Sequence, residues 1–422
     1  MPFALQAILW GVITLSIVVF LHEGGHFLAA RAFGVRVHEF MFGLPGPKIG
    51  FKRGDTLYGV TAIPFGGYNK IAGMDGDVTN VNLQPVLVAV TQAACPVTAR
   101  EIAEQFELDE EEAKLILTTL ADWSALACDK GQKTWSSRFA PELAGDPDAL
   151  FTKAKEHTYQ ALSFPKRAVV LLTGIIINII FALLVFTVVL SAWGQQVALN
   201  KVAPVAGGPA LTAGIAKGDR IIRIDNTTIA TFDDITGAVS RLDPGTRVTV
   251  TSVAPGASAS ARKQTQIILG RNPGNAKLGY LGIEAIPEYR RLSVPRAFGQ
   301  SFFYVKMTVQ GILGFFTPGK FTESINNSAS VVGIAVIAAD AAKTSAVDYA
   351  WLVAAISLSL GLMNLLPIPP LDGGKVIIEG IGALRRKPLG LKATASVSAV
   401  GLLVLVTFMV YVMGHDIFRI VK

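Results

Sequence analysis

Three residues near the start of the chain, His22, Glu23 and His26, have the types and spacing of a metal-dependent hydrolase site. They form the pattern HExxH at the end of an uncharged run, residues 3–21. If this run is helical, the two imidazoles lie one turn apart and can bind one metal ion. Glu23 lies beside them, where its carboxylate can take a proton from water that the metal has made acidic. The alternative is a pair of ordinary histidines at a helix end, but ionisable groups beside a membrane span are costly and usually functional.

The composition is that of a membrane protein with soluble inserts. The 422 residues are 51% hydrophobic and only 16% charged, which is unusual for a soluble enzyme. The net charge of +7 does not require nucleic acid, because the basic residues concentrate beside apolar segments. Cys95 and Cys128 form no C-x-x-C pair, so no disulfide framework is expected. The N-terminus has neither a basic segment nor a small-residue cleavage site, which favours a retained span over a signal peptide.

Four apolar stretches are long enough to cross a bilayer, residues 3–30, 168–193, 349–367 and 393–414. A fifth, residues 324–339, is short and is expected to be re-entrant or interfacial. Lys and Arg follow the first span, precede the second and lie between the third and fourth, so these ends are assigned to the cytosol. The first and third spans then end at the same depth.

That shared depth predicts a third metal ligand near the end of the third span, where Asp372 follows the segment NLLPIPPL. Pro367, Pro369 and Pro370 forbid a regular helix there, so the backbone must be held by protein or face a water-filled cavity. A carboxylate at the end of a broken span suits a metal ligand. The alternative is a helix stop followed by an Asp-Gly turn.

The two motifs together resemble the site-2 protease family of intramembrane zinc metalloproteases, to which the bacterial regulator of sigma-E protease belongs. HEGGH and NLLPIPPLDGG match the family patterns HExxH and NxxPxPxLDG at every fixed position. The resemblance implies that His22, His26 and Asp372 bind Zn²⁺, that Glu23 is the general base, and that Asn364 holds the substrate backbone. It covers the chain except for residues 79 to about 160.

Residues 40–74 contain short β-like runs separated by glycine and proline, which predict hairpins. They resemble the membrane-associated β-region of the family, which offers an edge strand to the substrate. A peptide bond within a helix is shielded, so a transmembrane substrate must be extended before attack, and a sheet edge satisfies its backbone groups. The alternative is an ordinary linker hairpin.

The segment 79–163 is an insert with two capping boxes, Thr98 with Glu101 and Asp109 with Glu112. Its sequence resembles the helix-turn-helix of winged-helix domains. Residues 100–122 hold eight acidic and two basic residues, which argues against nucleic acid because phosphate contacts need positive charge. We expect a small cytosolic helical or winged-helix-like module that binds a protein partner or packs on the membrane domain.

After the second span, residues 195–288 are β-like and glycine-rich and resemble a bacterial PDZ domain, which binds a peptide as an added strand. The alternative is a small β-domain without a ligand.

Aromatic residues over 293–317, mixed with Arg296 and Lys306, predict an amphipathic helix on the outer membrane surface. Asn178 should face the helix bundle, because an amide in hydrocarbon needs a partner. Asn326 and Asn327 match a family loop but have no assigned role.

The predicted fold is a polytopic α-helical membrane protein with four transmembrane helices, a membrane-associated β-region, a PDZ domain and a small helical cytosolic insert. Its predicted parts are 1–33 (first span with HExxH), 34–78 (β-region), 79–163 (insert), 164–194 (second span), 195–288 (PDZ domain), 289–345 (amphipathic helix and re-entrant or interfacial segment), 346–375 (third span with NxxPxPxLDG) and 376–422 (loop and fourth span).

The predicted function is an intramembrane zinc metalloendopeptidase that cleaves single-span membrane proteins, such as anti-sigma factors or signal-peptide remnants, in regulated intramembrane proteolysis. It is a multi-pass protein of the inner (cytoplasmic) membrane, in contact with the lipid bilayer. Its active site faces the cytosol and its PDZ domain lies outside. Two alternatives are a non-catalytic scaffold that binds peptides through the PDZ domain, and a soluble metalloprotease tethered by one span, which would not need Asp372.

Gly24 and Gly25, inside the HExxH motif, are small enough to let another segment approach the metal.

Overall fold

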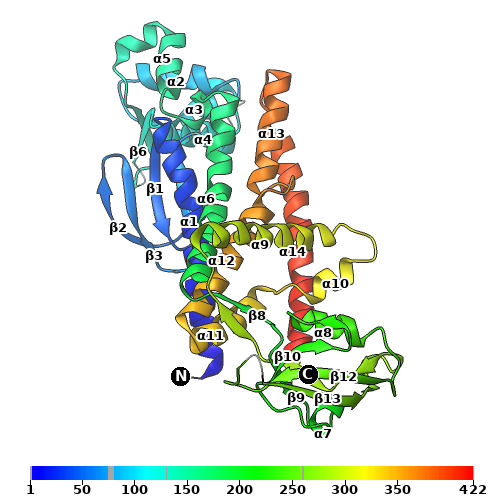
Figure 1. Cartoon of the computed structure of the whole chain (residues 1–422). Helices are drawn as coiled ribbons and strands as arrows, with labels where there is room; N and C mark the ends of the chain where they lie inside the picture. Colours follow the sequence, from blue (N-terminus) through cyan, green and yellow to red (C-terminus); the bar gives the residue numbers. More distant parts are fainter. Residues whose placement is uncertain (1, 75–79, 130, 259–260, 422) are drawn as a thin grey trace. The chain divides into compact units, whose positions relative to one another are not determined.

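The computed structural model describes residues 2–74, 80–129, 131–258 and 261–421. The chain divides into two compact units, Met1–Phe186 with Phe298–Lys422, and Thr187–Ala297. Helices α6 and α9 carry the chain between the units (Figure 1). The candidate metal centre lies wholly in the first unit, so each unit is described by itself.

Within the described ranges, four helices are long and apolar enough to cross a membrane. They are α1 (Phe3–Ala32), α6 (Phe164–Ala192), α12 (Ala346–Asn364) and α14 (Leu391–Val421), and they correspond to the four predicted spans. The third was predicted to reach residue 367 but α12 ends at Asn364. The residue before a proline is disfavoured in α-helical conformation, so the helix must end before Pro367.

Three further helices precede α12, namely α9 (Val294–Gly314), α10 (Phe321–Asn326) and α11 (Val331–Thr344). α11 lies against α1, because a Cβ placed on Gly11 would be only 2.7 Å from the Cβ of Ala335. The Asp416 carboxylate of α14 accepts a hydrogen bond from the Ser330 amide at the start of α11, at 2.6 Å. The apolar stretch 324–339 therefore contributes a helix of 14 residues packed in the bundle, too short to span a bilayer.

The β-region forms a four-stranded sheet with the order β2-β3-β1-β4. Its strands are β1 (Val37–Phe42), β2 (Lys48–Arg53), β3 (Thr56–Thr61) and β4 (Gly67–Ile71). β2 and β3 make the expected hairpin, whereas β1 runs parallel to β3 and antiparallel to β4. Strand β4 is therefore an edge strand, and it lies beside α1.

The insert has a hydrophobic core of its own, which includes Leu117, Leu120 and Trp123. Its elements are α2 (Leu83–Gln92), β5 (Val97–Thr98), α3 (Ala99–Phe106), α4 (Glu110–Asp122), β6 (Leu126–Asp129), β7 (Thr134–Ser137), the 3₁₀ turns η1 (Pro141–Gly145) and η2 (Tyr159–Ala161), and α5 (Pro147–Lys155). The elements follow the order helix, strand, two helices and two strands, and the three strands form a sheet with the order β5-β7-β6.

The two predicted capping boxes of the insert have different outcomes. Thr98 and Glu101 cap α3 reciprocally, as predicted. Asp109 precedes α4 but its side chain makes no capping hydrogen bond, so the second box is wrong. The C-terminal end of α4 is fixed to the β-region, because the Asp122 carboxylate accepts a hydrogen bond from the Gly73 amide at 2.7 Å.

The second unit is a small β-rich domain. A four-stranded sheet has the order β11-β10-β12-β13, and three further pairs are β14-β15, β16-β9 and β17-β8. The elements are β8 (Gln195–Val197), β9 (Val202–Pro204), α7 (Pro209–Thr212), β10 (Arg220–Ile224), β11 (Thr227–Thr228), α8 (Phe232–Val239), β12 (Arg247–Val253), β13 (Arg262–Ile268), β14 (Gly270–Arg271), β15 (Gly279–Tyr280), β16 (Ile283–Ala285) and β17 (Glu288–Arg290). Its aliphatic core, with Ile221, Val250 and Ile267, is separate from that of the first unit.

Candidate metal centre

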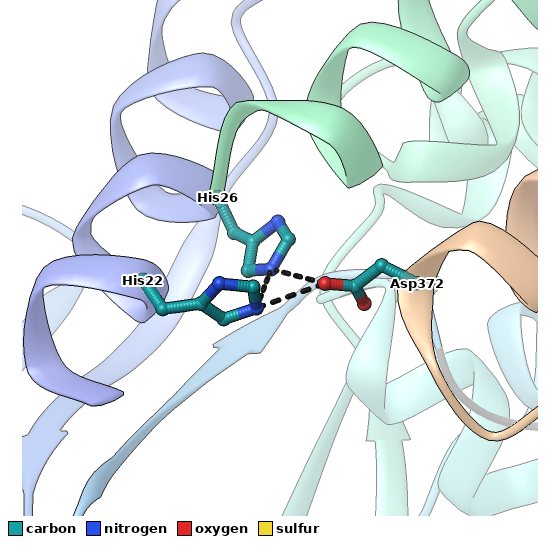
Figure 2. A group of neighbouring side chains, drawn as sticks. All are labelled: His22, His26 and Asp372. Carbon is teal, nitrogen blue, oxygen red and sulfur yellow. Dashed lines mark hydrogen bonds and ion pairs between the residues drawn. The ribbon is translucent and has the colours of Figure 1, made fainter. Parts of the chain in front are cut away.

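Two helices bring the three predicted ligands together. His22 and His26 lie one turn apart on α1, and Asp372 is the first residue of α13 (Asp372–Arg385). Figure 2 shows both imidazoles directed at one carboxylate oxygen. Asp372 Oδ2 lies 2.9 Å from His22 Nε2 and 3.2 Å from His26 Nε2, and the two nitrogens are 3.1 Å apart. All three residues are buried.

This donor set fits zinc. Bonds of about 2.0–2.1 Å in a tetrahedral site place ligand atoms roughly 3.3 Å apart, and the three separations here are slightly smaller. Two imidazoles and one carboxylate leave a fourth position open, as in catalytic zinc sites. Across residues 2–74, 80–129, 131–258 and 261–421, no other group of three or more His, Cys, Asp or Glu side chains has this metal-binding geometry.

A hydrogen bond on the far side of His26 sets its tautomer. Nδ1 of His26 lies 2.8 Å from the carbonyl oxygen of Val170 on α6. A carbonyl only accepts, so the ring proton belongs on Nδ1, and the lone pair of Nε2 faces His22 and Asp372. Orienting a ligand imidazole through its other nitrogen is the usual arrangement in metal sites.

The loop between α12 and α13 aims Asp372 at α1. A Cβ on Gly373 would lie 2.3 Å from the Leu365 carbonyl oxygen, and one on Gly374 would lie 2.2 Å from the Pro369 nitrogen. The glycine pair therefore lets residues 365–371 fold back over the first turn of α13. The alternative of an Asp-Gly turn is wrong, because Asp372 begins a helix instead.

A residue that the sequence reasoning missed, Asn69, holds the predicted general base. Nδ2 of Asn69 donates to Glu23 Oε2 at 2.6 Å and lies 3.0 Å from the Glu23 carbonyl oxygen. Asn69 is on β4, so the edge strand is tied to the HExxH helix. Asparagine is depleted in strands, and its presence within the predicted β-region was a signal that could have identified it.

Replacing Asn69 by Val should lower kcat about ten- to a hundredfold with little change in KM. The reason is that a hydrogen bond to a charged group contributes about 1.5–3 kcal/mol and here orients the base rather than the substrate. Asn80→Val is the matched control, because Nδ2 of Asn80 donates to Glu112 in the insert at 2.9 Å. Steady-state cleavage of a tagged single-span protein measures both constants, and equal effects of the two variants would contradict the assignment.

A second polar link holds β4 to β1. Tyr68 donates to Glu39 Oε2 at 2.7 Å, and Lys48 also bonds to this carboxylate. Partial burial and the hydrogen bond to Glu39 raise the pKa of Tyr68 to about 12. Partial burial alone would raise the pKa of Glu39, but the bonds from Lys48 and Tyr68 lower it below its usual value. Glu39 therefore stays charged at neutral pH and Tyr68 stays a donor.

Gly25, but not Gly24, is the point where another segment approaches the site. A Cβ on Gly25 would lie 2.7 Å from the backbone of Gly174 on α6, whereas one on Gly24 would meet only Phe40, at 4.0 Å. A Cβ on Gly174 would itself be 2.6 Å from His26 Nε2. The backbones of α1 and α6 touch beside the imidazoles.

Gly25→Ala should lower cleavage activity at least tenfold, whereas Gly24→Ala should leave it within about twofold of the wild type. Both changes favour the helix by up to about 1 kcal/mol, so only the clash with α6 distinguishes them. Separating α6 from α1 would weaken the bond between His26 and Val170. Activity per folded protein in membranes tests the pair, and equal activity of the two variants would refute the close-approach argument.

Two predicted polar residues lie near the centre without joining it. Asn364 ends α12, and its Nδ2 donates to the Leu360 carbonyl oxygen of its own helix at 3.1 Å. Asn178 on α6 is fully buried and faces α12 beside Gly361, so it faces the bundle as predicted. Among the described residues, the side-chain amide of Asn178 has no hydrogen-bond partner, whereas its backbone carbonyl oxygen accepts a hydrogen bond from Ser357 Oγ at 3.1 Å. Asn326 and Asn327 lie exposed at the end of α10.

Comparisons with known proteins agree with the site. The model of peptidase family M50 matches residues 10–408. A protein of Mesorhizobium japonicum, named “Putative zinc metalloprotease”, is 28% identical over 420 residues, covering 96% of each chain. A Brucella suis protein with the same description is 27% identical over 416 residues, covering 96% of this chain and 93% of its own. “Zinc metalloprotease RasP” of Shouchella clausii is 24% identical over 419 residues, covering 96% and 97%.

These matches show that the protein is a zinc metalloprotease. More narrowly, the chain belongs to peptidase family M50. The resemblance to the site-2 proteases is thereby confirmed, and with it the expectation of a Zn²⁺-dependent enzyme. The four apolar helices fit the membrane character of the family.

Proposed function

We propose that the protein is an intramembrane endopeptidase that cuts single-span membrane proteins beside His22, His26 and Asp372. The observation that carries this proposal is the convergence of two imidazoles from α1 and a carboxylate from α13 on one buried point. These three side chains would hold a zinc ion, which would supply Lewis-acid chemistry for a scissile carbonyl and for a water molecule.

Glu23 is the proposed general base. Glu23 directly follows His22 on α1, its carboxylate is held by Asn69, and it is not one of the three grouped ligands. It accepts the proton of the attacking water and then passes it to the leaving amine, as general acid–base catalysis requires. The hydrogen bond from Asn69 limits the rotation of the carboxylate between these two steps.

The substrate is proposed to be extended along β4. The sheet order leaves β4 with one partner, β1, in the described sheet, so an unwound substrate backbone can pair with its other edge. The bond from Asn69 to Glu23 places this strand next to the catalytic carboxylate. Asn364 is proposed to hold the substrate backbone from the α12 side, which requires it to leave Leu360.

The β2–β3 hairpin is proposed to contact lipid. Every residue of β2 is exposed, and Ile49 and Phe51 have exposed fractions of 81% and 66%. Val60 on β3 is also exposed. Apolar side chains presented together on a sheet outside a core are typical of a membrane- or protein-binding face.

The other parts are assigned by the same reasoning. The active-site ends of the spans are placed on the cytosolic side of a bacterial cell membrane, because the Lys and Arg residues flank those ends. The domain at 195–288 is proposed to be a PDZ domain on the outer side, supported by its four-stranded antiparallel sheet and helix α8. The insert, fixed to the β-region through Asp122, is proposed to bind a protein rather than nucleic acid.

Mapping the cut sites of purified protein on tagged single-span substrates tests the proposal. Candidate substrates are anti-sigma factors and signal-peptide remnants, the class that regulated intramembrane proteolysis would provide. Mass spectrometry of the products should place the cut inside the apolar segment. Cuts confined to water-exposed flanks would contradict intramembrane proteolysis. Binding without cleavage would favour the scaffold alternative, which the zinc metalloprotease relatives do not favour.

A further inference from the structure

A cavity of about 340 Å³ lies away from the metal centre, where the insert meets α6 and α13. Lys155 and Gln160 line it from the insert, Arg167 from α6, and Glu379, Arg386 and Lys387 from α13 and the residues that follow it. This volume is within the range of small-ligand sites. The lining holds four cationic side chains and one carboxylate, a net of three positive charges.

The single carboxylate of the cavity is already occupied. Glu379 Oε2 lies 2.7 Å from Arg167 Nη1. Among the described residues, no carboxylate is within ion-pair distance of Lys155, Arg386 or Lys387. Three cations therefore share a concave surface without a negative partner, and their mutual repulsion favours binding an anion there.

The backbone and its neighbours hold these cations in place. Lys155 Nζ lies 4.0 Å from the ring centroid of Phe151, which limits its movement. Arg386 caps the C-terminal end of α13 in the left-handed conformation, with φ 54°. The amide of Lys387 donates to the Gly382 carbonyl oxygen at 3.1 Å, which fixes the turn. Partial burial lowers the pKa of Lys155, so a bound anion would remove an electrostatic cost.

We propose that this cavity binds a phosphate-bearing anion, the headgroup of an anionic phospholipid or a free phosphate, and thereby ties the insert to α6 and α13. A lipid is favoured by position, because Arg167 directly precedes the charge-free run 168–193 of α6. That run enters hydrocarbon, so Arg167 lies at headgroup depth. Since α13 begins with Asp372 and Arg386 lies at its other end, the anion would bind about four turns along the helix that carries the candidate metal ligand.

The test compares two charge-matched triple variants of the full-length, zinc-loaded protein. One removes cations that line the cavity (Lys155→Gln, Arg386→Gln and Lys387→Gln). The control removes neighbouring exposed cations that do not line it (Lys153→Gln, Arg385→Gln and Lys392→Gln). The relative association of spin-labelled phosphatidylglycerol over phosphatidylcholine is measured by electron paramagnetic resonance, a readout independent of cleavage.

If the lipid is the ligand, the preference for phosphatidylglycerol falls at least threefold in the cavity variant and is unchanged in the control. If the ligand is soluble, that preference is equal in all three proteins, while millimolar inorganic phosphate raises the Tm of the wild type and the control but not of the cavity variant. Equal loss of lipid preference in both variants would indicate a delocalised charge effect and overturn the proposal. So would equal lipid preference without any selective effect of phosphate.

Discussion

Cleavage of a single-span substrate is expected to fall by a factor of about 10²–10⁴ when Glu23 is replaced by Gln, while the protein keeps its zinc. A positioned general base typically contributes a rate factor of this size. Glutamine has nearly the same shape and can still meet the Asn69 amide through its oxygen, so the fold should be preserved. Glu23 is not among the three converging ligand atoms, so metal content should stay at one ion per chain.

The measurement pairs single-turnover cleavage with zinc analysis on the same purified sample. Glu39→Gln is the matched control, because Glu39 also accepts a hydrogen bond from β4, from Tyr68, but lies outside the ligand group. Its activity should remain within a fewfold of the wild type. If Glu23→Gln cleaved at the wild-type rate, the general base would have to be another residue. If it lost zinc as well as activity, Glu23 would be a ligand instead.

The chemistry of the site could be predicted because it depends on residue type and local spacing. HExxH places two imidazoles on one helix face whatever surrounds the helix, and two motifs that end spans at one depth bring Asp372 toward them. The apolar length of the spans is likewise a local property. These features require no knowledge of which helix packs against which.

The contacts that support the site could not be predicted, because they join segments far apart in the chain. The bond from His26 to the Val170 carbonyl depends on how α6 packs against α1. The bond from Asn69 to Glu23 depends on β1 pairing in parallel with β3, which leaves β4 at the sheet edge. The sequence predicted hairpins, and a hairpin pattern does not specify a parallel pair. Gly25 was identified as a possible close approach, but its partner Gly174 was not identified for that role.

The predicted role of Asp372 as the third zinc ligand depends directly on the convergence of α1 and α13. Asp372→Asn is expected to reduce bound zinc well below one ion per chain and to lower cleavage by at least about a hundredfold. An amide keeps the shape but removes the negative charge, and two neutral imidazoles alone hold a divalent cation poorly.

Asp348→Asn is a close control, because Asp348 also lies in the first turn of an apolar helix, α12. Each loses a carboxylate that favours a helix N-terminus by about 0.3–1 kcal/mol, so this contribution cancels in the comparison. Zinc analysis after dialysis against a weak chelator should therefore separate the two variants. If Asp372→Asn retained a full equivalent of zinc as firmly as Asp348→Asn, the third ligand would have to be sought elsewhere, and the meeting of α1 and α13 would be a packing contact alone.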